Sequence, residues 1–242
     1  YCVRRLGEIN TSLGFFRPLL VLAIFGLLIL SQPDLGSTLV IGALVIAILF
    51  FAGISFSQFI LLLLLMGILT VVAIYFEPYR YLRFISFTEP FEDFRGSGWQ
   101  LSNALLGIGR GEWFGIGLGN SFQKNLYLPE PHTDFIFAVI VEEFGLIGGL
   151  IVILLFAVLI FGIIKTSIKA LELGKLFQGF LVFGAGILIA IQAAFNIGVN
   201  LGILPTKGLT LPFISYGGSS LILFMFLIGV VLRINFENKT IK

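Results

Sequence analysis

Charged residues are scarce in this chain. Only 12% of its 242 residues are Asp, Glu, Lys or Arg, whereas 58% are hydrophobic. This composition is typical of an integral membrane protein and excludes an ordinary soluble domain. The net charge of +2 is small and no basic cluster stands out, so nothing in the sequence points to a nucleic-acid partner.

Cysteine and histidine each occur once. Cys2 has no second cysteine to pair with, so the fold is not cross-linked by an internal disulfide and redox chemistry is not expected. The single histidine, His132, lies in the segment that carries the strongest candidate site.

Regular alternation of apolar and polar residues is also missing. The segments 61–65 and 151–156 are apolar on every face, which excludes the strands of a membrane β-barrel. Apolar runs close to the ~20 residues of a spanning helix recur along the chain. We therefore predict an all-α polytopic membrane protein, a single membrane domain with six transmembrane helices at about 13–30, 35–56, 59–76, 135–164, 176–201 and 209–232.

Basic residues predict the orientation of these helices. Lys and Arg in short loops favour the cytoplasmic side of a membrane. One side has Lys207 as the sole basic residue of its short loops, so we expect that side to face outward together with the long loop 77–133. Both chain ends are then cytoplasmic, on the side that carries Arg4, Arg5, Arg17, Lys165, Lys169, Lys175, Arg233, Lys239 and Lys242.

The segment YLPEPHTDF at 127–135 combines the histidine with two carboxylates immediately before an apolar run. Its two prolines keep Glu130 out of a helix, while Thr133 or Asp134 is placed to cap the helix that follows. A helix N-terminus stabilises a carboxylate, so we expect the pKa of Asp134 to be lowered. The segment predicts an active-site rim at a membrane surface.

A glycine-rich segment occupies 107–120 within the long loop. Its backbone N–H groups favour phosphate binding if they are exposed. Alternatively, the glycines permit tight packing of a surface or re-entrant loop, with Trp99 and Trp113 as anchors at the membrane interface. Both readings remain open from the sequence.

Polar residues inside the predicted helices form a second group. Gln192, Asn196 and Asn200 recur every four residues and share one helix face, which indicates either hydrogen bonding between helices or the lining of a polar cavity. Glu142 and Glu143 lie inside the fourth helix, where an unpaired carboxylate is costly. We expect at least one of them to face a wet cavity or a cation.

The predicted topology brings base candidates and anion binders to the outer membrane face. Asp34 precedes the second helix, where capping alone is an equal explanation. Ser215 and Ser219 follow the prolines of the segment 204–220 and are placed to close a re-entrant turn. The other residues on this face are Asp134, Lys207, Arg80, Arg83, Arg110 and Lys124.

Four motifs give the chain a recognisable pattern. QPDLG (32–36), LPEPHTDF (128–135), EEFG (142–145) and PTKGLTLPFISYGGSS (205–220) resemble the signature segments of the SEDS family of peptidoglycan polymerases (shape, elongation, division and sporulation). GSGWQ at 96–100, GRG at 109–111 and GLGNSFQK at 117–124 resemble its cell-division branch. The resemblance covers about the last six of the family's ten helices, so we expect further N-terminal sequence.

This resemblance implies a glycosyltransferase of the bacterial cytoplasmic membrane that polymerises lipid II into β-1,4 glycan strands at the division septum. Asp134 matches the family's essential aspartate and is the implied general base. The candidate cofactor is a divalent cation, Mg²⁺ or Mn²⁺. Implied partners are lipid II, the nascent glycan, a class B penicillin-binding protein and other division proteins of the membrane. A lipid II flippase and a non-catalytic scaffold for the penicillin-binding protein are the alternatives.

The resemblance and the predicted topology together define the candidate site. Asp134 is the catalytic residue, and Glu142, Gln192, Asn196 and Asn200 are the candidate cavity residues. The candidate substrate-binding residues are Lys207, Arg110, Lys124, Arg80, Arg83, Glu130, His132, Asp34, Ser215 and Ser219.

Overall fold

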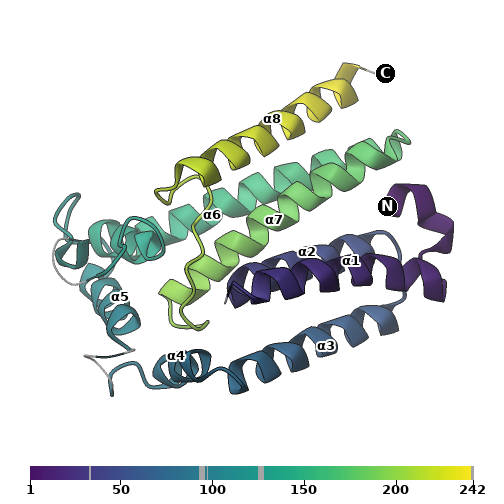
Figure 1. Ribbon diagram of the computed structural model, residues 1–242. Helices are drawn as coiled ribbons and strands as arrows, with labels where there is room; N and C mark the ends of the chain where they lie inside the picture. The colour runs from purple at the N-terminus through teal and green to yellow at the C-terminus, as the bar shows by residue number, and fades with distance from the viewer. Residues whose placement is uncertain (33, 93–95, 97, 125–127, 241–242) are drawn as a thin grey trace. The chain divides into compact units, whose positions relative to one another are not determined.

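The computed structural model describes residues 1–32, 34–92, 96, 98–124 and 128–240. Within this part of the chain every regular element is a helix, which confirms the predicted all-α class. The elements are η1 (Cys2–Glu8), α1 (Ser12–Leu30), α2 (Leu35–Phe51), α3 (Phe56–Tyr75), α4 (Pro78–Thr88), α5 (Trp99–Gly111), α6 (Ile136–Glu172), α7 (Leu176–Asn200) and α8 (Gly218–Thr240) (Figure 1).

Five of these helices, α1, α3, α6, α7 and α8, are long and apolar enough to cross a membrane. The helix α2 is equally apolar but has 17 residues. At ~1.5 Å per residue it spans roughly 25 Å, slightly less than the ~30 Å hydrocarbon core of a bilayer. The chain is therefore a polytopic membrane protein, as predicted.

The helix predicted over 35–56 ends earlier than expected. α2 stops at Phe51 and α3 begins at Phe56. In the turn between them Gly53 has a φ of 97°, a left-handed conformation that glycine adopts without strain. The apolar run continues through this turn, and for that reason hydrophobicity placed the break at 57–58, a few residues too late.

Two further helices differ from their predicted limits. α6 continues to Glu172, past the predicted end at 164, so that Lys165 and Lys169 lie on the helix. α8 begins at Gly218 instead of near 209. The preceding segment 205–217 is irregular because its two prolines cannot continue a helix.

The described residues of the predicted long loop 77–133 include the helices α4 and α5. α4 starts with Pro78 at its first position, where the missing N–H costs nothing, and α5 ends at Gly111. These helices bring the aromatic and basic residues of the loop into defined positions.

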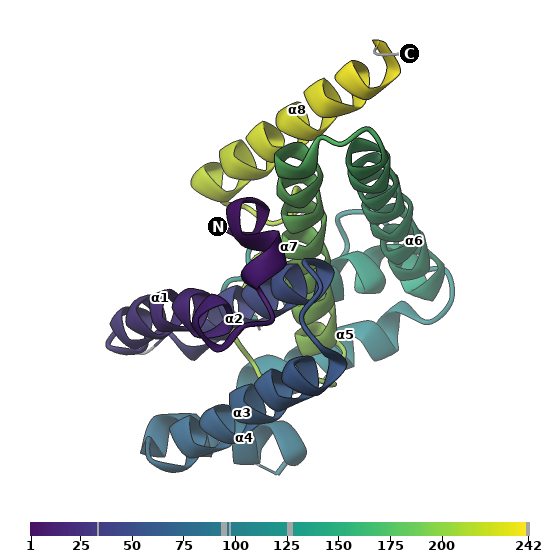
Figure 2. The ribbon, with the colours of Figure 1, turned by 90° about the vertical axis from the view of Figure 1, so that its right-hand side faces the viewer.

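The contacts within the chain group it into two compact units. The first unit comprises 1–73, 160–191 and 227–242, and the second comprises 74–159 and 192–226. Within the first unit α1 and α2 run side by side (Figures 1 and 2). All residues of the candidate site except Asp34 belong to the second unit.

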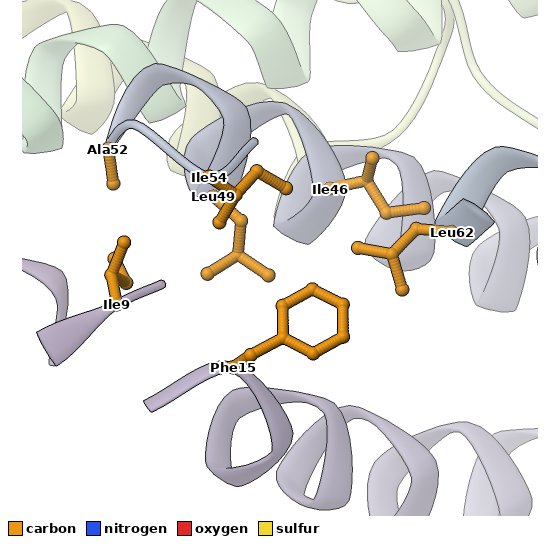
Figure 3. Close-up of a cluster of buried hydrophobic side chains, with 7 residues drawn as sticks. All are labelled: Ile9, Phe15, Ile46, Leu49, Ala52, Ile54 and Leu62. Carbon is orange, nitrogen blue, oxygen red and sulfur yellow. The ribbon is translucent and has the colours of Figure 1, made fainter. Parts of the chain in front are cut away.

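The first unit has an apolar core where η1, α1, α2 and α3 meet. In Figure 3 the ring of Phe15 points from α1 toward the aliphatic side chains of the other elements. Between membrane helices such a core is stabilised by close van der Waals packing, because lipid tails are as apolar as these side chains. The cluster consists of Ile9, Phe15, Ile46, Leu49, Ala52, Ile54 and Leu62.

The second unit has a smaller core that positions the candidate site. Leu128 and Phe135 are buried at the two ends of the segment 128–135 and pack with Ala104 of α5, Ala138 of α6 and Val199 of α7. Because both ends are anchored in the same cluster, the polar residues between them are held at its edge.

Candidate functional site

Asp134 lies in a turn just before α6. Glu130 has a φ of 52°, unusual for a residue with a side chain, and its carbonyl oxygen accepts a hydrogen bond from the Thr133 amide at 3.2 Å. The Thr133 hydroxyl also donates to the Glu130 carboxylate, at 3.2 Å. The segment is therefore closed on itself before the chain enters the helix.

The amide of Asn200 is inserted into the first turn of α6. In an uninterrupted helix the Ala138 amide would donate to the Asp134 carbonyl oxygen. Here Ala138 donates to Asn200 Oδ1 at 2.9 Å, and Asn200 Nδ2 donates to the Asp134 carbonyl oxygen, also at 2.9 Å. The side chain thus replaces one helical hydrogen bond and holds Asp134 outside the helix.

Asn196 reinforces this arrangement. Its Nδ2 donates to the Asp134 carbonyl oxygen at 2.9 Å and to the Leu209 carbonyl oxygen at 2.6 Å. Asn196 and Asn200 are both buried, and their amides are committed to backbone groups, so they do not line a cavity as one reading proposed. For Gln192, the buried Oε1 has no hydrogen-bond partner among the described residues.

The irregular segment 205–217 covers the turn and is tied to it. Ser215 Oγ donates to the Thr133 carbonyl oxygen at 2.6 Å, and the Tyr216 amide donates to the His132 carbonyl oxygen at 2.8 Å. A Cβ added to Gly208 would lie 3.1 Å from Asp134 Oδ2, so the backbone passes close to the carboxylate. Ser219 itself is exposed.

The carboxylate of Asp134 remains available for chemistry. Both side-chain amides reach its main-chain oxygen, and within the described part of the chain no hydrogen bond reaches the carboxylate. Burial raises the pKa of Asp134, and the charge of Glu130 raises it further, while Arg83 lowers it by a smaller amount. The predicted lowering by the helix N-terminus was wrong because the carboxylate is half-buried and caps no N–H group.

The other predicted outer-face residues occupy different surroundings. Lys207 is half-buried beside the turn segment and Glu130 is exposed. His132 is exposed and contributes its carbonyl oxygen to the structure. Asp34 belongs to the first unit, where its carboxylate caps α2 by accepting from the Ser37 amide at 3.0 Å.

Glu142 anchors a second polar cluster. Its side chain is 0% exposed, and Oε2 accepts from Ser121 Oγ at 2.5 Å and from the Gln123 amide at 3.4 Å. Arg110 lies 3.9 Å from Oε1, an atom that has no hydrogen-bond partner among the described residues. The guanidinium of Arg110 offsets part of the cost of removing the Glu142 carboxylate from water. Glu142 thus has a cation nearby, one of the two surroundings predicted for Glu142 or Glu143.

Lys124, like Arg110, lies near a carboxylate of α6. Its Nζ lies 3.8 Å from Glu143 Oε1, on the residue next to Glu142. Arg110 and Lys124, which were predicted to bind substrate, thus neutralise two neighbouring carboxylates of α6. Of the four residues that motivated the transporter alternative, Asn196, Asn200 and Glu142 are engaged by protein groups, whereas Gln192 Oε1 has no partner among the described residues.

The glycine-rich segment closes a break in α6. Gly145 has φ 73° and ψ −176°, which interrupts the helix. The segment 112–117 lies in this break, and Gly115 packs so closely that an added Cβ would overlap the Glu143 carbonyl oxygen. Tight packing, the second of the two readings, therefore describes this loop. Four backbone hydrogen bonds cross the break: Ile116 to Glu142, Gly117 to Glu143, Leu146 to Glu112 and Ile147 to Trp113.

The donor set for a divalent cation is limited. Asp134 and Glu130 are near enough for the charge of one to affect the other, so they supply two oxygen-bearing side chains of the kind that Mg²⁺ or Mn²⁺ prefers. Among the described residues no group of three His, Cys, Asp or Glu side chains is placed to hold a metal. A cation at Asp134 would need ligands from a substrate or water.

A cavity of about 770 Å³ lies between α4, the start of α5 and the segment that leads to Asp134. Its walls include Tyr79, Arg83, Trp99 and Gln100. Of these, only Arg83 was predicted to belong to the site, and Trp99 was interpreted as an interface anchor. The available signal was the gathering of aromatic and polar residues in an extramembrane loop, and only the folding of α4 against α5 makes it a cavity.

The fold and the site define a polytopic membrane protein with a half-buried carboxylate at a helix start, beside a cavity of ligand size. A family model described as "Cell cycle protein", covering FtsW, RodA and SpoVE, matches residues 6–240. The chain belongs to this family, which confirms the resemblance to the SEDS proteins.

Curated relatives agree with this membership. The chain is 47% identical over its whole length to the probable peptidoglycan glycosyltransferase FtsW of Pasteurella multocida (strain Pm70), and covers 61% of that protein. It is 48% identical to the probable peptidoglycan glycosyltransferase FtsW of Haemophilus influenzae, and this match covers 100% of the chain and 62% of the relative. The chain thus spans about three fifths of the length of these relatives.

Solved structures show the same fold. A structure of a peptidoglycan synthase complex matches 96% of this chain and 64% of its own, with a TM-score of 0.75 and 27% identity. The crystal structure of a mutant rod-shape-determining protein RodA from Thermus thermophilus matches 98% and 63%, with a TM-score of 0.62 and 26% identity.

Proposed function

We propose that this chain forms the catalytic face of a peptidoglycan glycosyltransferase, in which Asp134 is the general base. The curated relatives carry this activity in their names, and the motifs of the chain occur in the order typical of the family. The substrate is lipid II, and the product is a glycan strand extended through β-1,4 bonds.

The observation that carries this proposal is the state of Asp134. Its backbone is fixed by two buried asparagines, its carboxylate is free of hydrogen bonds to the described residues, and burial raises its pKa. A general base works best when its pKa approaches the ambient pH, so a raised pKa favours this role. A capped carboxylate with a lowered pKa would be a weaker base.

In the proposed reaction Asp134 takes the proton from the 4-hydroxyl of the acceptor sugar. The oxygen then attacks the anomeric carbon of the donor, the bond to the lipid pyrophosphate breaks, and the electron pair leaves with the pyrophosphate. Base and leaving group stand on opposite faces of the sugar, so the configuration inverts. The proton returns from Asp134 to solvent.

The leaving pyrophosphate requires positive charge. Lys207, in the segment over the turn, and Arg83, whose charge reaches Asp134, are candidates in the second unit. Arg80, on α4 in the same unit, remains a further candidate. A divalent cation held by Asp134, Glu130 and the substrate would supply further charge stabilisation. Arg110 and Lys124 become available only if their contacts with α6, at 3.9 and 3.8 Å, open.

Family membership supports a location in the bacterial inner membrane. We propose that both chain ends are cytoplasmic, that Asp134 lies on the outer face and that the protein acts at the division septum. A class B penicillin-binding protein is the proposed partner. Similarity to a peptidoglycan synthase complex supports this choice, since that complex couples polymerisation to crosslinking.

The test is Asp134→Asn in the complete protein, with polymerisation of lipid II as the readout. Loss of the base is expected to reduce the rate by roughly 10²–10⁴-fold. Glu172→Gln, an exposed acid-to-amide change at the end of α6, is the matched control and should retain activity. Polymerisation within tenfold of wild type would refute the assignment, and movement of labelled lipid II without chain growth would support a transporter instead.

Stability provides a check that the variant is folded. A raised pKa means that the folded protein binds this proton more tightly than the unfolded chain does. The stabilisation from the protonated form is present below the ordinary pKa and is lost as the pH rises through the raised value. Asp134→Asn, which resembles the protonated form, should therefore melt no lower than wild type at neutral pH.

A further inference from the structure

The cavity that borders the segment leading to Asp134 has the size of a ligand site. Its volume of about 770 Å³ falls within the roughly 300–1,000 Å³ of small-molecule pockets. The walls come from α4, from the start of α5 and from Pro129 in the segment that leads to Asp134. All of these belong to the second unit, so the cavity is formed within one compact body.

Two observations connect the cavity to Asp134. Pro129, one wall residue, lies in the same closed turn, which is anchored by Leu128 and Phe135. Arg83, another wall residue, is near enough for its charge to lower the pKa of Asp134. The cavity and the carboxylate therefore share the anchored segment 128–135, which supplies a wall residue to one and carries the other.

The walls combine aromatic rings with hydrogen-bonding groups. Tyr79 and Trp99 supply aromatic rings, and the half-buried Gln100 carries an amide that both donates and accepts. Arg83 is held against Tyr79, with its Cζ 4.6 Å from the ring centre, which fixes its position. Leu82 adds apolar surface.

This wall chemistry favours a saccharide over the two other parts of a lipid-linked substrate. A sugar ring has an apolar C–H face that packs on an aromatic ring and an edge of hydroxyl and N-acetyl groups that pair with an amide. A pyrophosphate needs several cations, whereas Arg83 is the single cationic wall residue among those described. A lipid tail needs an entirely apolar groove.

We propose that this cavity binds the N-acetylated amino sugar whose hydroxyl Asp134 deprotonates, an inference that rests on the proposed function. Trp99 and Tyr79 pack against the ring faces, Gln100 pairs with hydroxyl or N-acetyl groups, and Arg83 orients the polar edge. The cavity is thus the acceptor subsite, and α4 and α5 are the elements that form it.

The experiment measures binding of a soluble disaccharide, N-acetylglucosaminyl-N-acetylmuramic acid without lipid or phosphate, to the complete protein in nanodiscs. Trp99→Ala is expected to weaken binding by about tenfold, since truncation of a central Trp contact commonly costs that much. Trp99→Phe should retain most of the affinity. Trp113→Ala is the matched control, because Trp113 is the other tryptophan of the chain and lies outside this cavity.

Turnover separates this proposal from the assignment of the base. Trp99→Ala should raise KM for the acceptor more than it lowers kcat, whereas Asp134→Asn should abolish turnover and bind the disaccharide as wild type does. An active Asp134→Asn refutes the base, whatever the outcome at Trp99. Unchanged disaccharide binding in Trp99→Ala refutes the acceptor subsite, even if Asp134→Asn is inactive.

Two further binding measurements identify which part of the substrate occupies the cavity. Binding of inorganic pyrophosphate that Arg83→Gln removes, with no binding of the disaccharide, would make the cavity an anion site and overturn the proposal. Weaker binding of intact lipid II alone in Trp99→Ala would place the lipid-linked end there and also overturn it. If Trp99→Ala fails to fold, Tyr79→Leu and Gln100→Leu, at half-buried or exposed positions, should show the same loss of affinity.

Discussion

The pair of buried asparagines on α7 permits a quantitative test of how Asp134 is held. Both Asn196 and Asn200 donate to the Asp134 carbonyl oxygen at 2.9 Å. In Asn196→Ala or Asn200→Ala the oxygen keeps one donor. Only the double variant leaves it without a side-chain donor, so we expect the two substitutions to be more than additive.

The magnitude follows from the hydrogen bonds. A buried backbone group without a partner costs about 1–3 kcal/mol. The two side chains also contact each other directly, at 3.3 Å, and either single variant already removes this contact. The double variant loses the contact only once, so the contact lowers the expected coupling energy. Such contacts in membrane proteins average about 0.6 kcal/mol. The expected coupling is therefore about 0.5–2.5 kcal/mol, or roughly 1–10 °C in melting temperature beyond the sum of the singles.

The assay is a double-mutant cycle on thermal unfolding of the protein in nanodiscs, with polymerisation measured in parallel. Displacement of a catalytic group by about 1 Å costs on the order of 10²-fold in rate, so activity should fall more steeply than stability. Asn120→Ala is the control, because Asn120 is exposed and its amide donates to Ile116. Strictly additive melting temperatures, with full activity in the double variant, would contradict the role of the pair.

Two further predictions concern the surroundings of the carboxylate and the packing of α5. Glu130→Gln removes a nearby anion and should lower the pKa of Asp134, so the acid limb of the kcat–pH profile should move to lower pH. Arg83→Gln removes a nearby cation and should move the same limb to higher pH. Identical acid limbs in both variants and wild type would contradict the effect of these charges on Asp134. Gly111→Ala should destabilise the protein by about 1–3 kcal/mol because an added Cβ overlaps a carbonyl oxygen of α6. Gly109→Ala, which faces open space, should change melting little, and equal effects would refute the contact.

Features that depend on local composition were predictable. The apolar runs identified the membrane helices, because burial in a bilayer demands about 20 apolar residues whatever the tertiary fold. The break between the second and third helices was predicted at 57–58 but lies at 52–55 around Gly53, since the apolar run is nearly continuous and does not mark where the backbone turns. The break at Gly145 was not predicted, and there a second segment of the chain supplies the missing hydrogen bonds.

The sequence by itself identified a polytopic membrane protein and its family resemblance, and through that resemblance it predicted Asp134 as the catalytic residue. These conclusions depend on composition and on short motifs, which are local properties of the chain. The tertiary structure decided the state of that residue: Asn196 and Asn200 from a distant helix hold its backbone, and burial together with Glu130 raises its pKa. Desolvation and long-range hydrogen bonds depend on which segments meet in space, and a linear pattern does not contain that information.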